Sequence, residues 1–207
     1  PRFNTDRTAF VEAGLTYRSL FRSVADDPWY RSDSADFPGT TPPRRLTPDQ
    51  LASAVEALTG YRWRVEGGLD AMVNDDYGFR ILNGGVDGLL VVEAPSTESA
   101  PVALVQERLA ELASPFAVAA EAQLPASERL LFREQGALSE EPTDAELRAQ
   151  VRGLLRRVHG KTVALDGEEV TALAELWVAL RAEASGPEVA WGWLLSSLLR
   201  HPDFVTY

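Results

Sequence analysis

The sequence predicts a mainly α-helical fold, an irregular helical bundle with a glycine-rich loop region and at most a short strand pair. Two capping boxes, Thr47 to Gln50 and Thr143 to Glu146, each precede a run with apolar residues at helical spacing. Between these runs, six glycines at positions 67 to 88 interrupt any helical period. The helices are therefore expected on either side of a region of turns.

The N-terminal stretch carries a weaker helical signal. Asp6 can cap a first helix, and Gly14 and Thr16 predict an interruption in it. Asp26 to Arg45 is rich in Pro, Ser, Asp and Gly and indicates a long irregular loop. The apolar face of the helical stretch consists of Phe10, Val11, Leu15, Leu20, Phe21 and Val24.

The strongest local signal in the chain is Thr47 to Gln50. Threonine is a good N-cap, Pro48 suits the first helical position, and Gln50 can reach back to the cap. This helix is expected to stop at Gly60.

The glycine-rich region that follows contains two ambiguous segments. Tyr61, Trp63 and Val65 alternate as in a short strand. The apolar run at 89–92 fits either a buried strand or an extended segment, and periodicity does not decide between them. Five apolar or aromatic residues should pin this region to the helical body: Trp63, Tyr77, Phe79, Ile81 and Leu82.

Helical periodicity resumes at Pro101 and continues through Val118. Ser114-Pro115 within this run would allow a kink. A shorter helix is predicted from Ser127 to Gln135.

Three further helices complete the predicted bundle. The first runs from the Thr143 cap to Gly160, the second from the Asp166 cap to Gly186, and the third from Pro187 to just before Pro202. The loops between them are short, so these helices are expected to be antiparallel neighbours. We therefore predict one helical domain over residues 1–207, with a possible N-terminal lobe 1–60, a glycine-rich loop region 61–97 and a C-terminal bundle 98–207.

Composition excludes several classes of function. The 31 acidic and 20 basic residues give a net charge of −11, which disfavours binding to nucleic-acid phosphates. The chain has no cysteine, which excludes disulfides, thiolate zinc sites, iron–sulfur clusters and covalently attached c-type haem. No apolar run reaches the roughly 20 residues of a membrane helix, so we expect no transmembrane segment in this chain.

The glycine-rich region also contains the weak metal candidates Asp75, Asp76 and Asp87. Calcium prefers several oxygen ligands from a bent loop, and these carboxylates could provide them. Their spacing matches no calcium-binding motif, so turn-forming residues that bond to their own backbone are the favoured interpretation. No other cofactor and no catalytic residue is predicted.

The two histidines and a tryptophan pair also have structural interpretations. His159 and His201 each end a predicted helix, where a cation complements the helix dipole, and no Gly-x-Ser-x-Gly elbow supports a catalytic triad. Trp191 and Trp193 are two residues apart on one helix, so they cannot both face the core. One of them is therefore expected to reach a partner or a neighbouring loop.

Short motifs along the chain, in this order, resemble helical domains of unknown function from large secreted planctomycete and myxobacterial proteins, which accompany a c-type cytochrome module. The motifs are Tyr17 to Ser23 with Trp29-Tyr30, Arg44 to Leu51 with Leu58-Thr59-Gly60, Tyr77 to Asp87, and Trp193 to Leu199 with His201 to Phe204. The resemblance implies a periplasmic or extracellular protein and supplies no catalytic residue. This chain lacks the haem-binding Cys-x-x-Cys-His of some of these proteins, so a redox group would belong to another segment or subunit.

The function expected from these observations is a non-catalytic helical interaction or structural module, a subunit of a cell-envelope or redox assembly that binds a protein partner. The alternative is a hydrolase of envelope material or polysaccharide that uses Asp75, Asp76 or Asp87. A deep pocket with a perturbed carboxylate at that loop would favour the hydrolase. An exposed apolar patch with a tryptophan at its centre would favour the interaction module.

Overall fold

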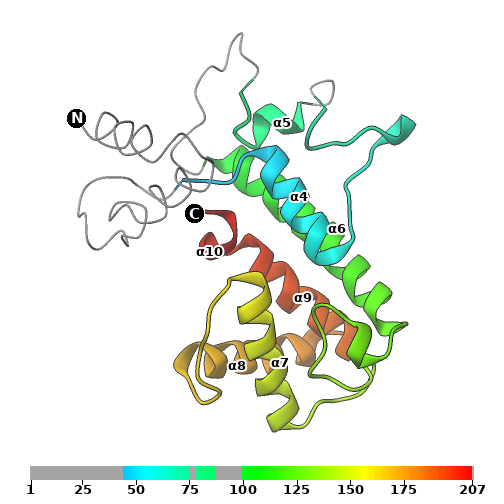
Figure 1. Cartoon of the computed structure of the whole chain (residues 1–207), viewed down its shortest axis with the longest axis vertical. Helices are drawn as coiled ribbons and strands as arrows, with labels where there is room; N and C mark the ends of the chain where they lie inside the picture. The colour runs from blue at the N-terminus through cyan, green and yellow to red at the C-terminus, as the bar shows by residue number, and fades with distance from the viewer. Residues whose placement is uncertain (1–43, 75–77, 87–98, 207) are drawn as a thin grey trace, which may run out of the picture. The chain divides into compact units, whose positions relative to one another are not determined.

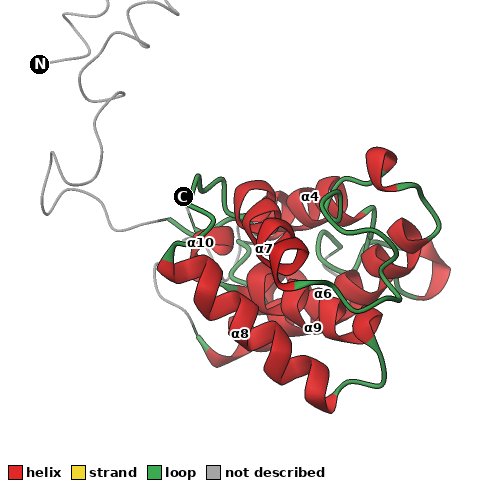
Figure 2. Cartoon of the chain, turned by 90° about the horizontal axis from the view of Figure 1, so that it is seen from below, coloured by secondary structure: helices red, strands yellow, loops and turns green. Residues whose placement is uncertain are grey.

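The computed structural model describes residues 44–74, 78–86 and 99–206, which belong to one compact unit that begins at Pro43 (Figure 1). Within these ranges the chain is mainly helical and forms no strand, which confirms the predicted fold class (Figure 2). The Asp6 cap, nearly all of the loop from Asp26 to Arg45 and the apolar run at 89–92 lie outside the described residues.

Helices of very different length follow one another in the described part. In chain order these are α4 (Pro48–Thr59), the 3₁₀ turn η1 (Glu66–Gly68), α5 (Phe79–Leu82), α6 (Ala100–Ala122), the 3₁₀ turn η2 (Ala126–Glu128), α7 (Asp144–Val158), α8 (Glu168–Glu183), α9 (Pro187–Arg200) and α10 (Pro202–Val205).

Both predicted capping boxes form. The Gln50 N–H donates to Thr47 Oγ1 at 3.3 Å, and the Thr47 N–H donates to Gln50 Oε1 at 2.9 Å. Thr143 and Glu146 make the same reciprocal pair at the start of α7. Gly60 ends α4 with a φ of 71°, a left-handed conformation that glycine adopts without steric cost.

The central element of the described bundle is α9, which contacts α6, α7, α8 and α10 (Figures 1 and 2). It is apolar on most of its circumference, as a helix surrounded by neighbours must be. Trp191 is fully buried, and its ring centroid lies 5.0 Å from that of Trp177 and 5.8 Å from that of Phe132. The core is thus built around the inner face of α9.

The helix α6 runs without interruption through Pro115, in contact with α9. A Cβ atom added to Gly192 of α9 would lie 3.9 Å from Pro115 Cα, so the two backbones approach closely there. The helix α4 also packs on α6 (Figure 1). The start of the described chain is joined to its end, because the Leu46 N–H donates to Val205 O at 2.8 Å.

The short strand considered at Tyr61 to Val65 does not form. Arg64 and Asp70 make one isolated antiparallel bridge, and Gly67 and Gly68 between them have φ angles of 81° and 77°. The two glycines reverse the chain between the bridge residues. Asp70 Oδ1 accepts the N–H groups of Met72 and Val73, so the chain turns again directly after the bridge and no second pair forms. The region is attached to the body only in part as predicted. Trp63 and Phe79 pack against the core with ring centroids 4.8 Å apart, whereas Ile81 and Leu82 are 38% and 45% exposed and Tyr77 lies outside the described residues.

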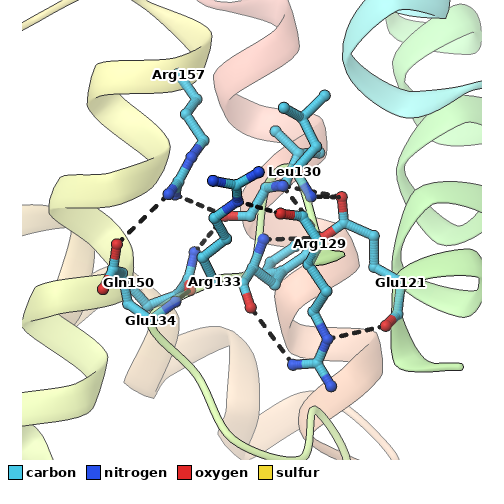
Figure 3. Close-up of polar contacts among 9 residues, drawn as sticks. Glu121, Arg129, Leu130, Arg133, Glu134, Gln150 and Arg157 are labelled. Atoms are coloured by element: carbon cyan, nitrogen blue, oxygen red, sulfur yellow. Dashed lines mark hydrogen bonds and ion pairs between the residues drawn. The ribbon is translucent and has the colours of Figure 1, made fainter. Parts of the chain in front are cut away.

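The predicted helix from Ser127 to Gln135 is wrong. Only the turn η2 is helical there, and the backbone that follows is bound by side chains instead (Figure 3). The carboxylate of Glu121 accepts hydrogen bonds from the backbone N–H groups of residues 130, 131 and 132, at 3.0, 2.9 and 2.8 Å. The Arg129 guanidinium donates to the backbone carbonyls of Glu121, Leu124, Phe132, Gln135 and Gly136.

These two charged side chains are deeply buried, with Glu121 7% and Arg129 5% exposed. Gln150 of α7, also buried, accepts a hydrogen bond from the Glu134 N–H at 3.0 Å and donates to Leu131 O at 2.8 Å. Helical backbone hydrogen bonds are thus replaced by bonds to side chains from α6, α7 and the segment itself. Leaving one of these buried backbone N–H or C=O groups without a hydrogen-bond partner would cost about 1–3 kcal/mol of stability.

The predicted cap at Asp166 is also wrong. The N-cap of α8 is Gly167, which makes no side-chain capping bond. The Gly167 N–H donates to Ala164 O at 3.1 Å, so the preceding turn places residue 167 at the cap. A Cβ at this position would lie 3.0 Å from Ala164 O, which favours glycine here.

Replacing Arg129 with Met should lower the free energy of unfolding by about 3 kcal/mol or more, because five backbone carbonyls, most of them buried, lose their hydrogen-bond donor. Urea denaturation followed by circular dichroism measures this. The matched control is Arg152→Met at an exposed position of α7, which should change the stability by less than about 0.5 kcal/mol. Equal losses in the two variants would contradict the role assigned to Arg129.

Candidate functional site

A groove of about 770 Å³ lies between α6, α8 and α9. Pro115, Val118 and Ala119 of α6 form one wall, and Leu176 and Leu180 of α8 form the other. The residues of α9 that line it are Glu188, Val189, Gly192, Trp193, Ser196, Ser197 and Arg200.

Trp193 is the largest apolar side chain in this groove and is 43% exposed. Its position follows from the helix period, because a residue two positions along a helix points to a very different side. Trp191 is held in the core between Trp177 and Phe132, so Trp193 must point away from it. The prediction that only one of the two tryptophans faces the core is therefore confirmed.

The polar residues of the groove are mostly acidic. It is lined by the three carboxylates of Glu107, Glu111 and Glu188, with one cation, Arg200. Arg200 pairs with Glu107, and Arg108 lies 3.3 Å from Glu111. These pairs are exposed and add little to stability. They offset two of the three carboxylates, so the groove has a small negative excess around an apolar centre.

The groove offers binding surface without an arrangement for nucleophilic catalysis. The Ser197 hydroxyl donates to Leu194 O of its own helix at 2.7 Å. The lining residues include no histidine that could activate a serine. This surface can therefore bind a ligand through apolar contacts and charge.

A second group of candidate side chains lies where the end of α7 meets the junction of α9 and α10. His159 Nε2 is 3.0 Å from Leu198 O, and the ring centroids of His159 and His201 are 5.1 Å apart. The Asp203 N–H donates to His201 Nδ1 at 3.2 Å, and Lys161 Nζ lies 2.7 Å from Asp203 Oδ2. We call His159, His201 and Asp203 the histidine cluster.

Local sequence signals position each member of this cluster. Gly160, with a φ of 68°, turns the chain away at the end of α7 directly after His159. Pro202 opens α10 directly after α9, so His201 caps both helices.

The electrostatics of the cluster are dominated by burial and by Lys161. Burial lowers the pKa of His159 below its ordinary value. The hydrogen bond from Lys161 lowers the pKa of Asp203, and the hydrogen bonds to Asp203 and Glu169 raise the pKa of Lys161. Lys161 and Asp203 are therefore both charged near neutral pH.

The predicted site residues have different outcomes. Asp75, Asp76 and Asp87 lie outside the described residues, so a calcium site or a hydrolase there stays a prediction. His159 and His201 do lie at helix ends as predicted, and His201 in addition accepts the Asp203 N–H at the start of α10. Sequence reasoning missed that the two histidines meet; His201-Pro202-Asp203 directly after a helix was the available signal.

Comparisons with protein-family models, with curated proteins and with solved structures found no match to this chain. Among the helices that the structure describes, none combines the length and apolar character needed to cross a membrane.

The burial of His159 predicts a pH-dependent stability. Its folded-state pKa is below the ordinary value of 6.5, so the unfolded chain binds this proton more readily than the native one. The contribution is fully present above the unfolded-state pKa and declines as the pH falls below 6.5 towards the folded-state pKa. The other titratable groups that act on His159 are His201, Asp203 and Lys161.

His159→Gln should therefore lose less stability than the original protein between about pH 7.5 and pH 5. Gln can still donate to Leu198 O but takes up no proton. Urea unfolding with a chelator present, at several pH values, measures the effect. Parallel stability curves for the two proteins would contradict it.

Proposed function

We propose that this chain is a non-catalytic helical interaction module that binds a helical segment of a partner protein in the groove between α6, α8 and α9. The observation that carries the proposal is Trp193, 43% exposed in an apolar groove. Tryptophan is enriched among the residues that contribute most to binding energy at protein interfaces. A large exposed aromatic ring in a concave surface is costly to leave in water and stabilising when covered.

The helical form of the partner is inferred from the shape and lining of the groove. Its walls are helices, and its centre combines Trp193 with Val189, Leu176 and Pro115. A helix whose apolar residues recur at i, i+3, i+4 and i+7 presents a matching stripe to such a surface.

The charge of the partner is inferred from the margin of the groove. The three carboxylates of the margin pair with two guanidinium groups, Arg200 and Arg108, which leaves one negative charge in excess, and the whole chain has a net charge of −11. Basic residues beside the apolar stripe would speed association and fix its orientation. The partner segment is thus an amphipathic helix with Lys or Arg on its flanks.

The wider context of the proposal is an exported assembly in the periplasm or outside the cell. The resemblance of the chain to helical domains that accompany secreted cytochrome modules supports this context. In such an assembly this chain would serve as a structural or docking subunit, and any redox group would belong to the partner.

Two synthetic helical peptides with the same apolar stripe test the proposal, one with Lys flanks and one with Glu flanks. The Lys peptide should bind at least tenfold more tightly in fluorescence anisotropy. Trp193→Ala should weaken its binding at least about tenfold, which is about 1.4 kcal/mol.

The matched control is Leu104→Ala, because Leu104 lies on α6 and is 64% exposed but does not line the groove. It should leave the affinity unchanged, whereas Ala119→Trp should fill the groove and block binding. No measurable binding of either peptide, or equal binding by the original protein and Trp193→Ala, would refute the proposed site.

A further inference from the structure

The histidine cluster has no part in the proposed groove, yet it brings three metal-ligating residues together. One ligand atom from each of His159, His201 and Asp203 lies within 4.8 Å of the others. The residues come from the end of α7 and from the junction of α9 and α10, which are packed elements of the bundle. Imidazole nitrogen with carboxylate oxygen is a ligand set that suits Zn²⁺.

His159 is oriented as a ligand. A carbonyl oxygen can only accept a hydrogen bond, so His159 Nε2 carries the proton that it donates to Leu198 O at 3.0 Å. The neutral ring then keeps its lone pair on Nδ1. This atom is buried and has no hydrogen-bond partner, an arrangement that costs free energy unless a ligand completes it. Metal-binding histidines commonly hold their second nitrogen on a backbone carbonyl in this way.

His201 and Asp203 lie where a second and a third ligand are needed. The two imidazole centroids are 5.1 Å apart, and two imidazoles on one tetrahedral zinc ion stand about 5 Å apart because Zn–N bonds are about 2 Å long. Asp203 Oδ2 is 3.3 Å from His201 Nδ1. This nitrogen accepts the Asp203 N–H at 3.2 Å, so a metal ion bound at Nδ1 would replace that hydrogen bond. The ligand atoms lie within 4.8 Å of one another and would have to approach to about 3.4 Å around one ion, and the side chains of His201 and Asp203 are exposed.

A cation is already held beside the cluster. The Lys161 ammonium lies 2.7 Å from Asp203 and 2.8 Å from Glu169. When Asp203 turns towards a metal ion, Lys161 retains Glu169 as its ion-pair partner.

We propose that His159, His201 and Asp203 bind one divalent transition-metal ion of the Zn²⁺ type. With three protein ligands, a tetrahedral ion keeps one position for water or for a group of a partner protein.

The test uses the intact, tag-free chain and Zn²⁺ alone in isothermal titration calorimetry. One ion per chain should bind and should raise the melting temperature. His159→Gln, His201→Ala and Asp203→Asn should each weaken binding at least tenfold. Co²⁺ should give a visible absorption spectrum of a tetrahedral site that these variants lose.

The matched control is Glu175→Gln, an exposed carboxylate on α8, which should leave Zn²⁺ affinity unchanged. His159→Gln keeps the proposal testable if His201→Ala does not fold, because its amide can still donate to Leu198 O. Absence of stoichiometric binding, or His159→Gln affinity equal to that of the original chain, would overturn the proposal.

Discussion

The buried charges of Glu121 and Arg129 determine how the irregular segment between α6 and α7 can enter the core. The Glu121 carboxylate accepts hydrogen bonds from three successive backbone N–H groups. The Arg129 guanidinium donates hydrogen bonds to backbone carbonyls on either side of them in the sequence. Without these partners, the buried N–H and C=O groups of this non-helical backbone would be unpaired. The free-energy cost of desolvating them would then exceed the gain from burying the apolar side chains of the segment. With them, Phe132 reaches the inner face of α9 and contacts Trp191. The central helix is thus packed on this side by a segment that has no regular structure.

The packing of Trp191 has a direct consequence for the surface. Because the core fixes the rotation of α9, Trp193 has to lie on the opposite side, in the groove between α6 and α8. The same helix ends at His201, which lies beside His159. Both candidate sites therefore depend on α9, one on its outer face and one at its C-terminal end. A change that rotated this helix in the core would alter both.

The sequence predicted correctly those helix ends that depend only on residues close together in the chain. The bonds of the capping boxes at Thr47 and Thr143 join residues three positions apart, and Gly60 needs only its own backbone freedom. The helix predicted at 127–135 was wrong for the opposite reason. Its backbone is bound by Glu121 from α6 and by Gln150 from α7, and no local pattern in the sequence indicates side-chain acceptors and donors that come from other elements.

The sequence by itself determined the helical class, the two capping boxes, the acidic charge and the fact that Trp191 and Trp193 cannot share one side of a helix. Which tryptophan faces out was decided only by tertiary packing, because both are equally apolar and only contacts with Trp177 and Phe132 distinguish them. The histidine cluster likewise depends on tertiary packing. His159 and His201 each occupy a helix end that the sequence indicates, but the contact between α7 and α9 alone brings their rings together, since local sequence does not encode the distance between two helix ends.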